Sequence, residues 1–413
     1  MSEKLGDAKI ISEDSTSTLL RKFQRTLAKL RKEGKFDNSL YFQIYPSDAS
    51  PPRMYGMVKA HKPEKNFPMR TVVSTVGTVS HGIAEHLVQL IQPTLDKNQT
   101  RLKNSTTFVS EAREWDIETN EIQVSYDVVA LYPSVPIQKA IDAITDILHD
   151  DIDHIKERTR LNLADIRMLI ELCLSRCYFL YENDIYEIED AGPIGLSLMV
   201  VIAEAYLQFL EKRALAIACG RDVQPITFKR YVDDSHARFK SSKDADEFLS
   251  ILNQQDPKIQ YTIEREDENK TLPFLDIKIR NDGSGSYDFN IFRKEAITNV
   301  QIKPHSCINP SIAEGVFKGF LSRAHRLCSP AHLQEEINFL INIFTENGHD
   351  KQNLEQIAEK YSPPADPIED QQDGTHKDKF VKIPWIPRLG PRLRTMYKKY
   401  GIKVIFTSGP NLG

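Results

Sequence analysis

The chain has 413 residues and a formal net charge of −4, with 40% hydrophobic and 27% charged residues. This composition is typical of a soluble globular protein with several subdomains. A polar N-terminus argues against a secretory signal, and the longest apolar stretch is too short to cross a bilayer.

Cysteine usage and the distribution of charge indicate the redox compartment of the protein and the kind of partner it could bind. The cysteines are Cys173, Cys177, Cys219, Cys307 and Cys328. Because their number is odd and they lack zinc-ligand spacing, we expect a reduced, intracellular protein. A nuclear location is a separate expectation that the cysteines do not address. The net charge does not by itself indicate a nucleic-acid partner. Basic residues are clustered, however, and local patches decide phosphate binding.

A basic amphipathic helix is predicted near the N-terminus. Leucine and phenylalanine recur at helical spacing between Ser17 and Lys35, with arginines and lysines around them, and Gly34 ends the helix as a cap. Such a helix either binds nucleic acid or presents a solvated face while it packs, and both interpretations stay open. Three prolines between residues 46 and 52 mark the end of this N-terminal extension, residues 1–48.

A strand with an acidic residue at its end is predicted over residues 121–128. Apolar and polar residues alternate there, so that Asp127 lies on the face opposite Val124 and Tyr126. Pro136 then begins a helix that runs to about residue 149. Further on, residues 197–215 are apolar on nearly every side, which predicts a helix buried under a sheet.

The most informative stretch is residues 226–239. Apolar and polar residues alternate up to Val232 and again up to Phe239, which predicts a β-hairpin with a two-residue acidic turn, Asp233 and Asp234. Adjacent like charges repel, so the turn requires a cation. Two Mg²⁺ or Mn²⁺ ions held by these carboxylates and Asp127 would suit two-metal nucleotidyl transfer.

The second half of the chain is predicted to be helical after a short β region. The predicted strands are residues 260–264, 274–280 and 288–292, and the predicted helices are residues 243–252, 311–327 and 331–344. Asn281 to Gly285 reads as a turn, and residues 361–379 read as a polar linker. The tail carries Arg392, Arg394, Lys398 and Lys399 between apolar residues, which predicts a helix that contacts phosphates.

Several motifs resemble one known family. Tyr231-Val232-Asp233-Asp234 resembles the Tyr-x-Asp-Asp motif of reverse transcriptases, and further segments resemble one branch of them, the Penelope-like retroelements. These segments are Tyr55–Pro63, Arg70–Ser74, Tyr126–Tyr132, Gly195–Glu204, Leu272–Asp276, His305–Pro310, Arg323–Ala324 and Gly401–Val404. They occur in the family's order over roughly residues 50–405, which makes the set far more specific than a lone Tyr-x-Asp-Asp.

The resemblance implies roles for the acidic residues and for one tyrosine. Asp127, Asp233 and Asp234 would be the catalytic metal ligands, with Asp234 the most peripheral of them. Tyr132 would lie beneath the incoming sugar, where a flat ring leaves no room for a 2′-hydroxyl. The alternative for Tyr132 is a core aromatic residue.

The resemblance also implies residues that bind nucleotide and nucleic acid. Arg70, with Lys59 nearby, would hold the triphosphate through paired hydrogen bonds. Gly195 would let template and nucleotide approach the backbone closely. His305 and Arg323 would contact the primer–template backbone. Surface ion pairs are the alternative for Arg70 and Lys59, and packing roles are the alternative for His305 and Arg323.

By resemblance, the fold is α+β, a right-hand polymerase with fingers, an antiparallel palm sheet and a helical thumb. Fingers and palm would span residues 49–294, the thumb residues 295–360, and a linker with a basic connector residues 361–413. The implied function is RNA-directed DNA polymerase of a Penelope-like retroelement. Its partners would be an RNA template, a DNA primer and deoxynucleoside triphosphates, with no membrane.

Two other functions stay open. The segment Gly195–Val200 lacks both prolines of the family's usual Gly-Ser-Pro-Leu-Ser-Pro, which favours a decayed or domesticated copy that binds nucleic acid without polymerising. A metal-dependent nuclease would use the same carboxylates, but Tyr132 has no role in one. Many Penelope-like elements carry a GIY-YIG endonuclease after the polymerase. The sequence ends at Gly413 without one, as expected of an endonuclease-lacking type or of a truncated sequence.

Overall fold

The structure, a computed structural model, describes most of the chain. The described residues are 8–12, 14–58, 67, 69–188, 192, 195–294, 298–306, 308–364 and 379–407. Contacts divide the chain into two compact units, which we describe separately. Unit 1 comprises Met1–Asn104 and Ile117–Phe274, and unit 2 comprises Ser105–Asp116 and Leu275–Gly413. These units do not test the subdomain boundaries expected at residues 48, 294 and 360, which stay predictions.

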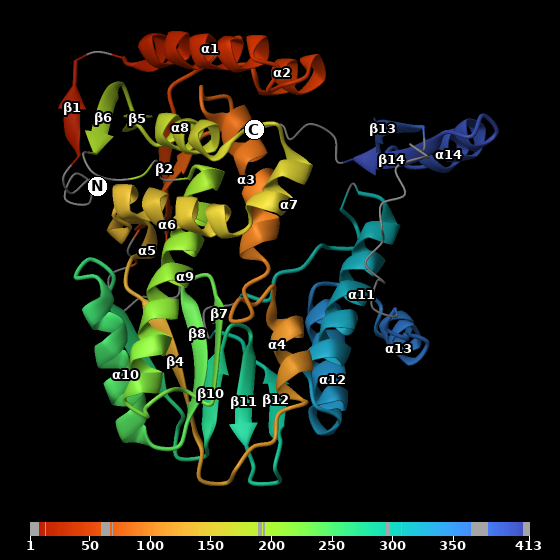
Figure 1. Cartoon of the computed structure of the whole chain (residues 1–413). Coiled ribbons are helices and arrows are strands. Elements are labelled where there is room, and N and C mark those ends of the chain that lie inside the picture. The colour runs from red at the N-terminus through yellow and green to blue at the C-terminus, as the bar shows by residue number, and fades with distance from the viewer. Residues whose placement is uncertain are drawn as a thin grey trace. The chain divides into compact units, whose positions relative to one another are not determined.

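One sheet of unit 1 has five strands. Their order is β1 (Lys9–Ile11), β6 (Asp184–Ile188), β5 (Cys177–Tyr181), β2 (Arg53–Val58) and β3 (Met69–Ser74). Neighbours are antiparallel except β2 and β5, which are parallel. The helices that precede or follow these strands are α1 (Thr16–Lys32), α2 (Asn38–Ile44), α3 (His81–Leu95), α7 (Ile152–Arg158) and α8 (Leu163–Cys173) (Figure 1).

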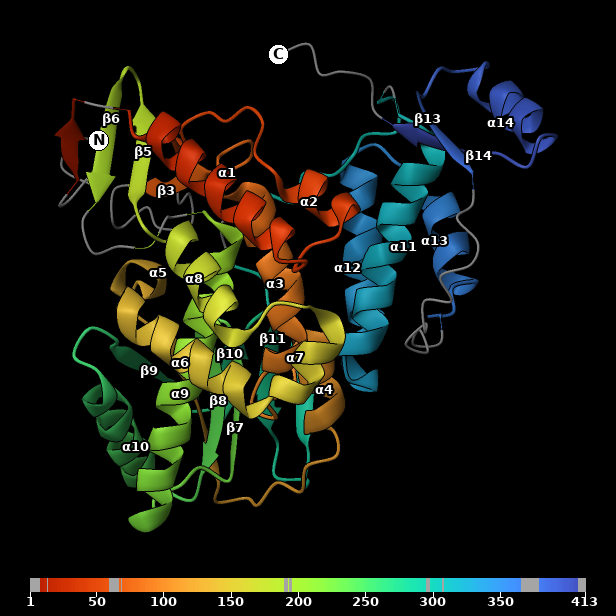
Figure 2. The ribbon, with the colours of Figure 1, turned by 45° about the horizontal axis from the view of Figure 1, so that its top comes forward.

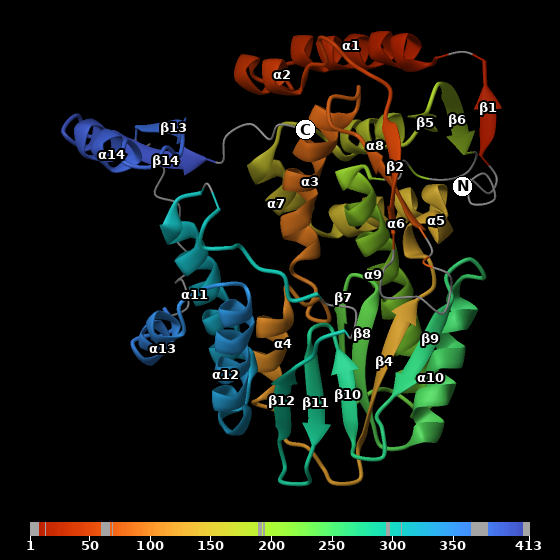
Figure 3. The same ribbon diagram turned by 180° about the vertical axis from the view of Figure 1, so that it is seen from behind.

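The other sheet of unit 1 has four antiparallel strands. Their order is β7 (Thr227–Tyr231), β8 (Asp234–Phe239), β4 (Ile122–Val128) and β9 (Tyr261–Arg265). Helices α9 (Ser197–Gly220) and α10 (Ser242–Gln255) cover one face, and the opposite face is turned toward the viewer in Figure 3. The remaining elements are α5 (Leu131–Ser134), α6 (Ile137–Asp150) and β10 (Thr271–Phe274).

The helix-covered face of this sheet is held by an aromatic cluster. Tyr126 of β4 and Phe239 of β8 pack against Phe248 of α10, with ring centroids 5.9 and 5.6 Å from that of Phe248. The Tyr126 hydroxyl donates a buried hydrogen bond of 2.9 Å to the Ala245 carbonyl oxygen. Asp127, one residue further along β4, therefore points away from the helices, as the alternation predicted.

Unit 2 contains a helical group and a small terminal α/β element. Its elements are α4 (Ser105–Ala112), β11 (Ile277–Asn281), β12 (Tyr287–Ile291), α11 (Pro310–Leu327), α12 (Pro330–Glu346), α13 (Lys351–Glu359), β13 (Phe380–Pro384), α14 (Gly390–Lys398) and β14 (Lys403–Thr407). The Phe317 and Phe344 rings, 4.9 Å apart, join α11 to α12. Strands β13 and β14 are parallel, with α14 between them in the chain.

Most predicted elements are confirmed within a few residues. The helices predicted near residues 17, 136, 197, 243, 311 and 331 correspond to α1, α6, α9, α10, α11 and α12. The Asn281–Gly285 turn joins β11 to β12, with φ of +80° at Gly283 and +94° at Gly285. None of the helices in the described ranges has the length and hydropathy that a bilayer span requires.

Three predictions about elements were wrong or fall outside the structure. The strand predicted over residues 274–280 is broken at Leu275, whose φ is +54°, so that β10 and β11 are separate. The tail is a strand–helix–strand element rather than a helix alone, because parallel pairing between β13 and β14 is not visible as a local pattern. The predicted linker lies largely in residues 365–378, outside the described residues.

The predicted hairpin is confirmed, but its turn was misplaced by one residue. Tyr231 pairs with Asp234, so that the two turn residues are Val232 and Asp233, and Asp234 is the first residue of β8. The turn requires a positive φ, and Val232 supplies it at +58°. A valine rarely adopts this conformation, so its neighbours must stabilise it.

Candidate active site

Strand pairing places two of the predicted acidic residues side by side. Asp127 of β4 is directly opposite Asp234 of β8, and Asp234 is in turn opposite Tyr231 of β7. Directly opposed residues of antiparallel strands share a face, with Cβ atoms about 4.5–5.5 Å apart. Asp127, Asp234 and Tyr231 therefore form a row on the face that α9 and α10 do not cover.

Asp233 lies beside this row, in the turn. Its carbonyl oxygen accepts a hydrogen bond of 3.2 Å from the Val128 amide, which fastens the turn to the end of β4. The segment that follows β4 turns sharply, because Ala130 has a φ of +49° just before α5. Strand end and hairpin turn thus meet at one edge of the sheet.

The carboxylates fit a divalent-cation site in chemistry and in part in geometry. Carboxylate oxygens are the ligands that Mg²⁺ prefers, and Asp127 and Asp234 present theirs on one face. In the part of the chain that the structure describes, no three His, Cys, Asp or Glu side chains gather as a metal site. A joint metal site of Asp127, Asp233 and Asp234 stays a prediction. Asp234, expected to be peripheral, is the residue opposite Asp127.

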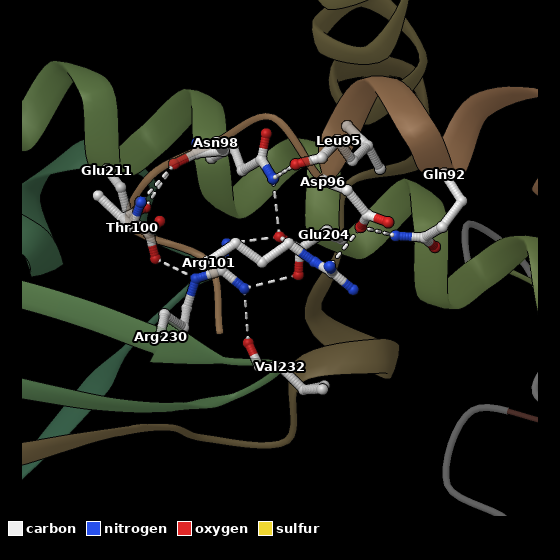
Figure 4. Close-up of polar contacts among 11 residues, drawn as sticks. Gln92, Leu95, Asp96, Asn98, Thr100, Arg101, Glu204, Glu211, Arg230 and Val232 are labelled. Carbon is white, nitrogen blue, oxygen red and sulfur yellow. Dashed lines mark hydrogen bonds and ion pairs between the residues drawn. The ribbon is translucent and has the colours of Figure 1, made fainter. Parts of the chain in front are cut away.

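A buried charge cluster supports the hairpin from the helix-covered face (Figure 4). Arg230 of β7 is 0% exposed, and its Nη1 and Nη2 donate hydrogen bonds of 2.8 and 3.0 Å to the Glu204 carboxylate of α9. Its Nε donates to Glu211, about two turns further along α9. Nη1 also donates, at 2.9 Å, to the Val232 carbonyl oxygen in the turn.

The two carboxylates of the cluster differ in electrostatics. Burial alone would raise the pKa of Glu204, but the Arg230 guanidinium and further hydrogen bonds outweigh it, and the pKa is lowered. For Glu211, burial prevails over Arg230 and raises the pKa to about 7. Glu211 Oε2 is buried with no hydrogen-bond partner among the described residues, which agrees with a carboxyl group that is easily protonated.

The cluster extends to the loop that follows α3. Arg101 forms an ion pair of 3.4 Å with Glu204 and a second one with Asp96. The Arg230 amide donates to the Thr100 carbonyl oxygen at 2.7 Å, and the Leu102 amide donates to the Arg230 carbonyl oxygen at 2.7 Å. The loop therefore forms an isolated parallel β-bridge to β7, between Arg101 and Arg230, and the hairpin is held through both backbone and side chain.

Tyr132 of α5 lies near the acidic turn. It is 36% exposed, and burial raises the pKa of its hydroxyl, with the negative charges of Asp233 and Glu204 adding to this effect. The position suits a residue that borders a nucleotide, although a role at the sugar stays a prediction.

Gly195 makes a close backbone contact of a different kind from the one expected. Its φ is +86°, and a Cβ atom there would lie 1.8 Å from the Val73 carbonyl oxygen of β3. The Thr75 hydroxyl donates to the Gly195 carbonyl oxygen at 3.1 Å. The contact that requires glycine is thus with strand β3. An approach of nucleotide or template to Gly195 stays a prediction.

The predicted triphosphate ligands are only partly described. Arg70 lies on β3 opposite Met57 of β2, and its side chain is outside the description. Lys59 lies outside the described residues. The Gly195 contact to Val73 nevertheless ties the start of α9 to the strand that carries Arg70.

The predicted nucleic-acid ligands of unit 2 lie in two places. Arg323 of α11 forms an ion pair with Asp276, which unites two of the family-like motifs, and His305 is exposed in a turn. The tail residues are Arg392, Arg394 and Lys398 on α14 and Lys399 directly after it, all exposed. Arg394 also lies 4.9 Å from the centroid of the Phe406 ring. Contacts with nucleic acid stay predictions for all of them.

Sequence reasoning missed the charge cluster around Arg230. A signal was present: Arg230 occupies an apolar position of an alternating strand, and Glu204 interrupts an otherwise apolar helix. Charged residues at such positions are rarely buried unless they are paired. Two unmatched opposite charges in elements of one subdomain therefore predict a buried ion pair.

Comparisons with known proteins identify the fold. The animal helix-turn-helix domain family matches residues 301–358 alone. No curated protein matches the sequence significantly. Telomerase from Candida albicans in complex with a fragment of telomeric RNA superposes with a TM-score of 0.50 at 8% identity, over 79% of this chain and 60% of that one.

Two further solved structures show lower similarity. Apo telomerase from Candida tropicalis has a TM-score of 0.45 at 10% identity, over 86% of this chain and 65% of that one. The BmCPV RNA-dependent RNA polymerase at its elongation state has a TM-score of 0.42 at 11% identity, over 81% and 30%. The chain thus spans 60% of the length of the Candida albicans telomerase chain.

The architecture and this likeness define the fold as a right-hand polymerase, as the sequence predicted. Identities of this size concern the fold alone. The mixed α+β organisation is confirmed as well, with the antiparallel sheet of β7, β8, β4 and β9 carrying the acidic row.

Gly195→Ala should lower the free energy of unfolding by about 2 kcal/mol or more, because the added methyl group meets the Val73 carbonyl oxygen and φ is positive. Gly220→Ala is the matched control: a Cβ atom there meets nothing within 4 Å, and alanine stabilises helices by about 0.5–1 kcal/mol relative to glycine. Urea unfolding measures both. Equal effects of the two substitutions would contradict the close contact.

Glu211 should make the protein less stable as the pH rises from 4.5 toward 7. Its folded pKa of about 7 exceeds the ordinary value of 4.5, so the folded state binds the extra proton in this window. The lost stability is on the order of 3 kcal/mol at most. Urea unfolding of the wild type and of Glu211→Gln over this range should show the decline only in the wild type. Glu264→Gln, at an exposed position of β9, should leave the decline unchanged.

Proposed function

We propose that this chain is an RNA-directed DNA polymerase, a reverse transcriptase of a Penelope-like retroelement. One observation carries the proposal: Asp127 and Asp234 oppose each other on the palm sheet of a right-hand polymerase fold, beside a turn that contains Asp233. The ordered family motifs from Tyr55 to Val404 support the choice of family. The coarser class, a nucleic-acid polymerase, rests on the fold.

In this function the acidic row concentrates negative charge where cations and phosphates would meet. Two Mg²⁺ ions bound by Asp127, Asp233 and Asp234 would activate the primer 3′-hydroxyl and stabilise the leaving pyrophosphate. Arg230 keeps the turn in place from the opposite face, so that the carboxylates do not move when charge is added. Binding energy from template and primer would align the reacting groups.

Tyr132 and Arg70 would act on the nucleotide itself. The Tyr132 ring, near Asp233, would close the pocket beneath the sugar and exclude a 2′-hydroxyl. Arg70, on β3, would bind the triphosphate. Gly195 would keep β3 and the start of α9 in register, which makes its effect on the nucleotide partly indirect.

In unit 2, the proposed nucleic-acid contacts are sequence-independent. His305 and the tail cations would meet backbone phosphates, whereas Arg323 would contribute less because Asp276 already neutralises it.

A second candidate is a polymerase-like protein that binds nucleic acid without catalysis. Two observations favour it: the three aspartates do not gather as one metal site among the described residues, and the Gly195 segment lacks the family's prolines. Primer extension with an RNA template, deoxynucleotides and Mg²⁺ separates the two candidates.

Asp127→Asn should reduce primer extension at least about a thousandfold, equivalent to about 4 kcal/mol in the activation free energy, because it removes a metal-binding charge. Asp233→Asn should do the same. RNA binding and the urea midpoint should remain near those of the wild type. Asp153→Asn, at an exposed position of α7, is the control and should extend normally. Wild-type extension by Asp127→Asn would refute the two-metal site.

Tyr132→Ala should raise ribonucleotide incorporation relative to deoxynucleotide incorporation by about tenfold or more, since each 1.4 kcal/mol of lost discrimination is a factor of about ten. The ratio of the two values of kcat/KM is the quantity to measure, because total activity also falls when the ring is lost. Tyr132→Phe keeps the ring and should keep the ratio. An unchanged ratio in Tyr132→Ala would show that the ring belongs to the core.

A further inference from the structure

Helix α1 carries a stripe of positive charge on its exposed side. Arg21, Lys22, Arg25, Lys29 and Lys32 are all exposed, and α1 contains no acidic residue. At 3.6 residues per turn these side chains fall within an arc of about 100°, opposite the buried Phe23, Leu27 and Leu30. The stripe between Lys22 and Lys32 is about 15 Å long.

The stripe is little neutralised by neighbouring groups. Within the described part of the chain it forms one ion pair, Lys29 with Glu33 at 3.9 Å, in which both side chains are exposed and the interaction is therefore weak. Arg21 donates to the Ser17 carbonyl oxygen at 3.3 Å and keeps its charge. Among the described residues, Lys22, Arg25 and Lys32 have no acidic partner within ion-pair distance. A stripe of this kind attracts a polyanion.

Near the C-terminal end of α1, on the flank that carries Arg31 rather than within the stripe, lies an exposed aromatic ring. Phe42 of α2 is 66% exposed, although phenylalanine usually buries its ring. The Arg31 guanidinium lies 4.4 Å from the centroid of the Tyr41 ring and 5.1 Å from that of Phe42, and its Nε donates to Asn38 at 3.1 Å. The exposed ring is thus held in place by a cation and a buried tyrosine.

We propose that α1 and α2 form a binding surface for single-stranded nucleic acid. Backbone phosphates would lie along the cationic stripe, and one base would stack on Phe42. Helix α2 lies at the C-terminal end of α1, on the face of unit 1 that is turned forward in Figure 2. Under the proposed function, on which this part of the inference rests, the ligand is the unpaired template strand.

Charge and ring together select the single-stranded form. A duplex meets a cationic helix equally well, but its bases are stacked on each other and cannot reach Phe42. Cations that follow the backbone and an aromatic ring that receives a base are the usual elements of single-strand binding, with about 1–3 kcal/mol for each stacked base. An acidic protein partner would use the stripe but would gain nothing specific from the ring.

The test of the stripe measures binding of fluorescein-labelled oligouridine to the full chain at several salt concentrations. The triple variant Lys22→Gln, Arg25→Gln, Lys29→Gln should reduce the slope of log K against log salt by about 2, at about 0.7 for each lost phosphate contact. The control triple Lys212→Gln, Lys240→Gln, Lys243→Gln removes three exposed cations of the same unit and should leave the slope unchanged. Equal losses in both triples, or no loss in the first, would overturn the proposal.

The test of the ring compares single-stranded and duplex RNA. Phe42→Ala should weaken oligouridine binding about tenfold and leave binding of a blunt duplex unchanged, whereas Phe42→Tyr should bind as the wild type. Equal weakening of both RNAs, or none, would show that the surface does not receive a base. Because Phe42 is exposed, urea midpoints near the wild-type value are expected and confirm that the variants fold.

The proposed binding surface can be confirmed or refuted independently of the proposed polymerase function. On a primer–template with a one-nucleotide overhang, the stripe and ring variants should extend as the wild type, because one unpaired nucleotide cannot follow a stripe about 15 Å long. If the wild type binds oligouridine as described but extends no primer, the polymerase proposal fails and the binding surface stands. If extension occurs but the variants bind normally, the reverse holds.

Discussion

The buried guanidinium of Arg230 is the interaction on which the acidic hairpin depends. It joins β7 to two carboxylates of α9 and to the carbonyl oxygen of Val232, at the point where the chain adopts a positive φ. A buried ion pair contributes little net stability, but removal of one partner leaves an uncompensated charge at a cost of about 3–5 kcal/mol. The cluster therefore acts chiefly as a constraint: the strained turn and the helix beneath it are held in one arrangement.

The two faces of the palm sheet therefore contribute to the site in different ways. On the covered face, charges are paired and aromatic rings pack, so that the sheet is rigid. On the other face, Asp127 and Asp234 lie opposite each other, and neighbouring carboxylates of this kind are stabilised where a cation binds. The loop along β7 and the contact between Gly195 and Val73 attach the remaining segments of the site to this frame.

Local sequence patterns correctly predicted those structural features that are determined by residues close together in the chain. Alternation placed Asp127 on a strand end, helical spacing placed α1, α6 and α9, and the resemblance to a polymerase family is borne out at the level of the fold. The position of the turn was predicted wrongly because strand register and two ion pairs set it. These ion pairs join Arg230 to Glu211 and Glu204, which precede it in the chain by 19 and 26 positions. Parallel pairing of β13 with β14 is equally non-local. Gly195 was singled out as a site of close approach, but only the structure identifies Val73 as what approaches it.

The short helix α4 has a consequence for how this protein can be divided. It lies between Asn104 and Ile117 in the chain but belongs to unit 2, where Trp115 packs against Tyr287 and Arg113 donates to the Cys328 carbonyl oxygen. The chain therefore passes between the units three times, after residues 104, 116 and 274. Cleavage after residue 274 would give two fragments. The later fragment would lack α4, which belongs to its core, and the earlier fragment would carry α4 as an apolar helix without its packing partners. A half made of unit 2 alone would need α4 supplied to it, for example through a designed linker, and a half made of unit 1 alone would need residues 105–116 removed.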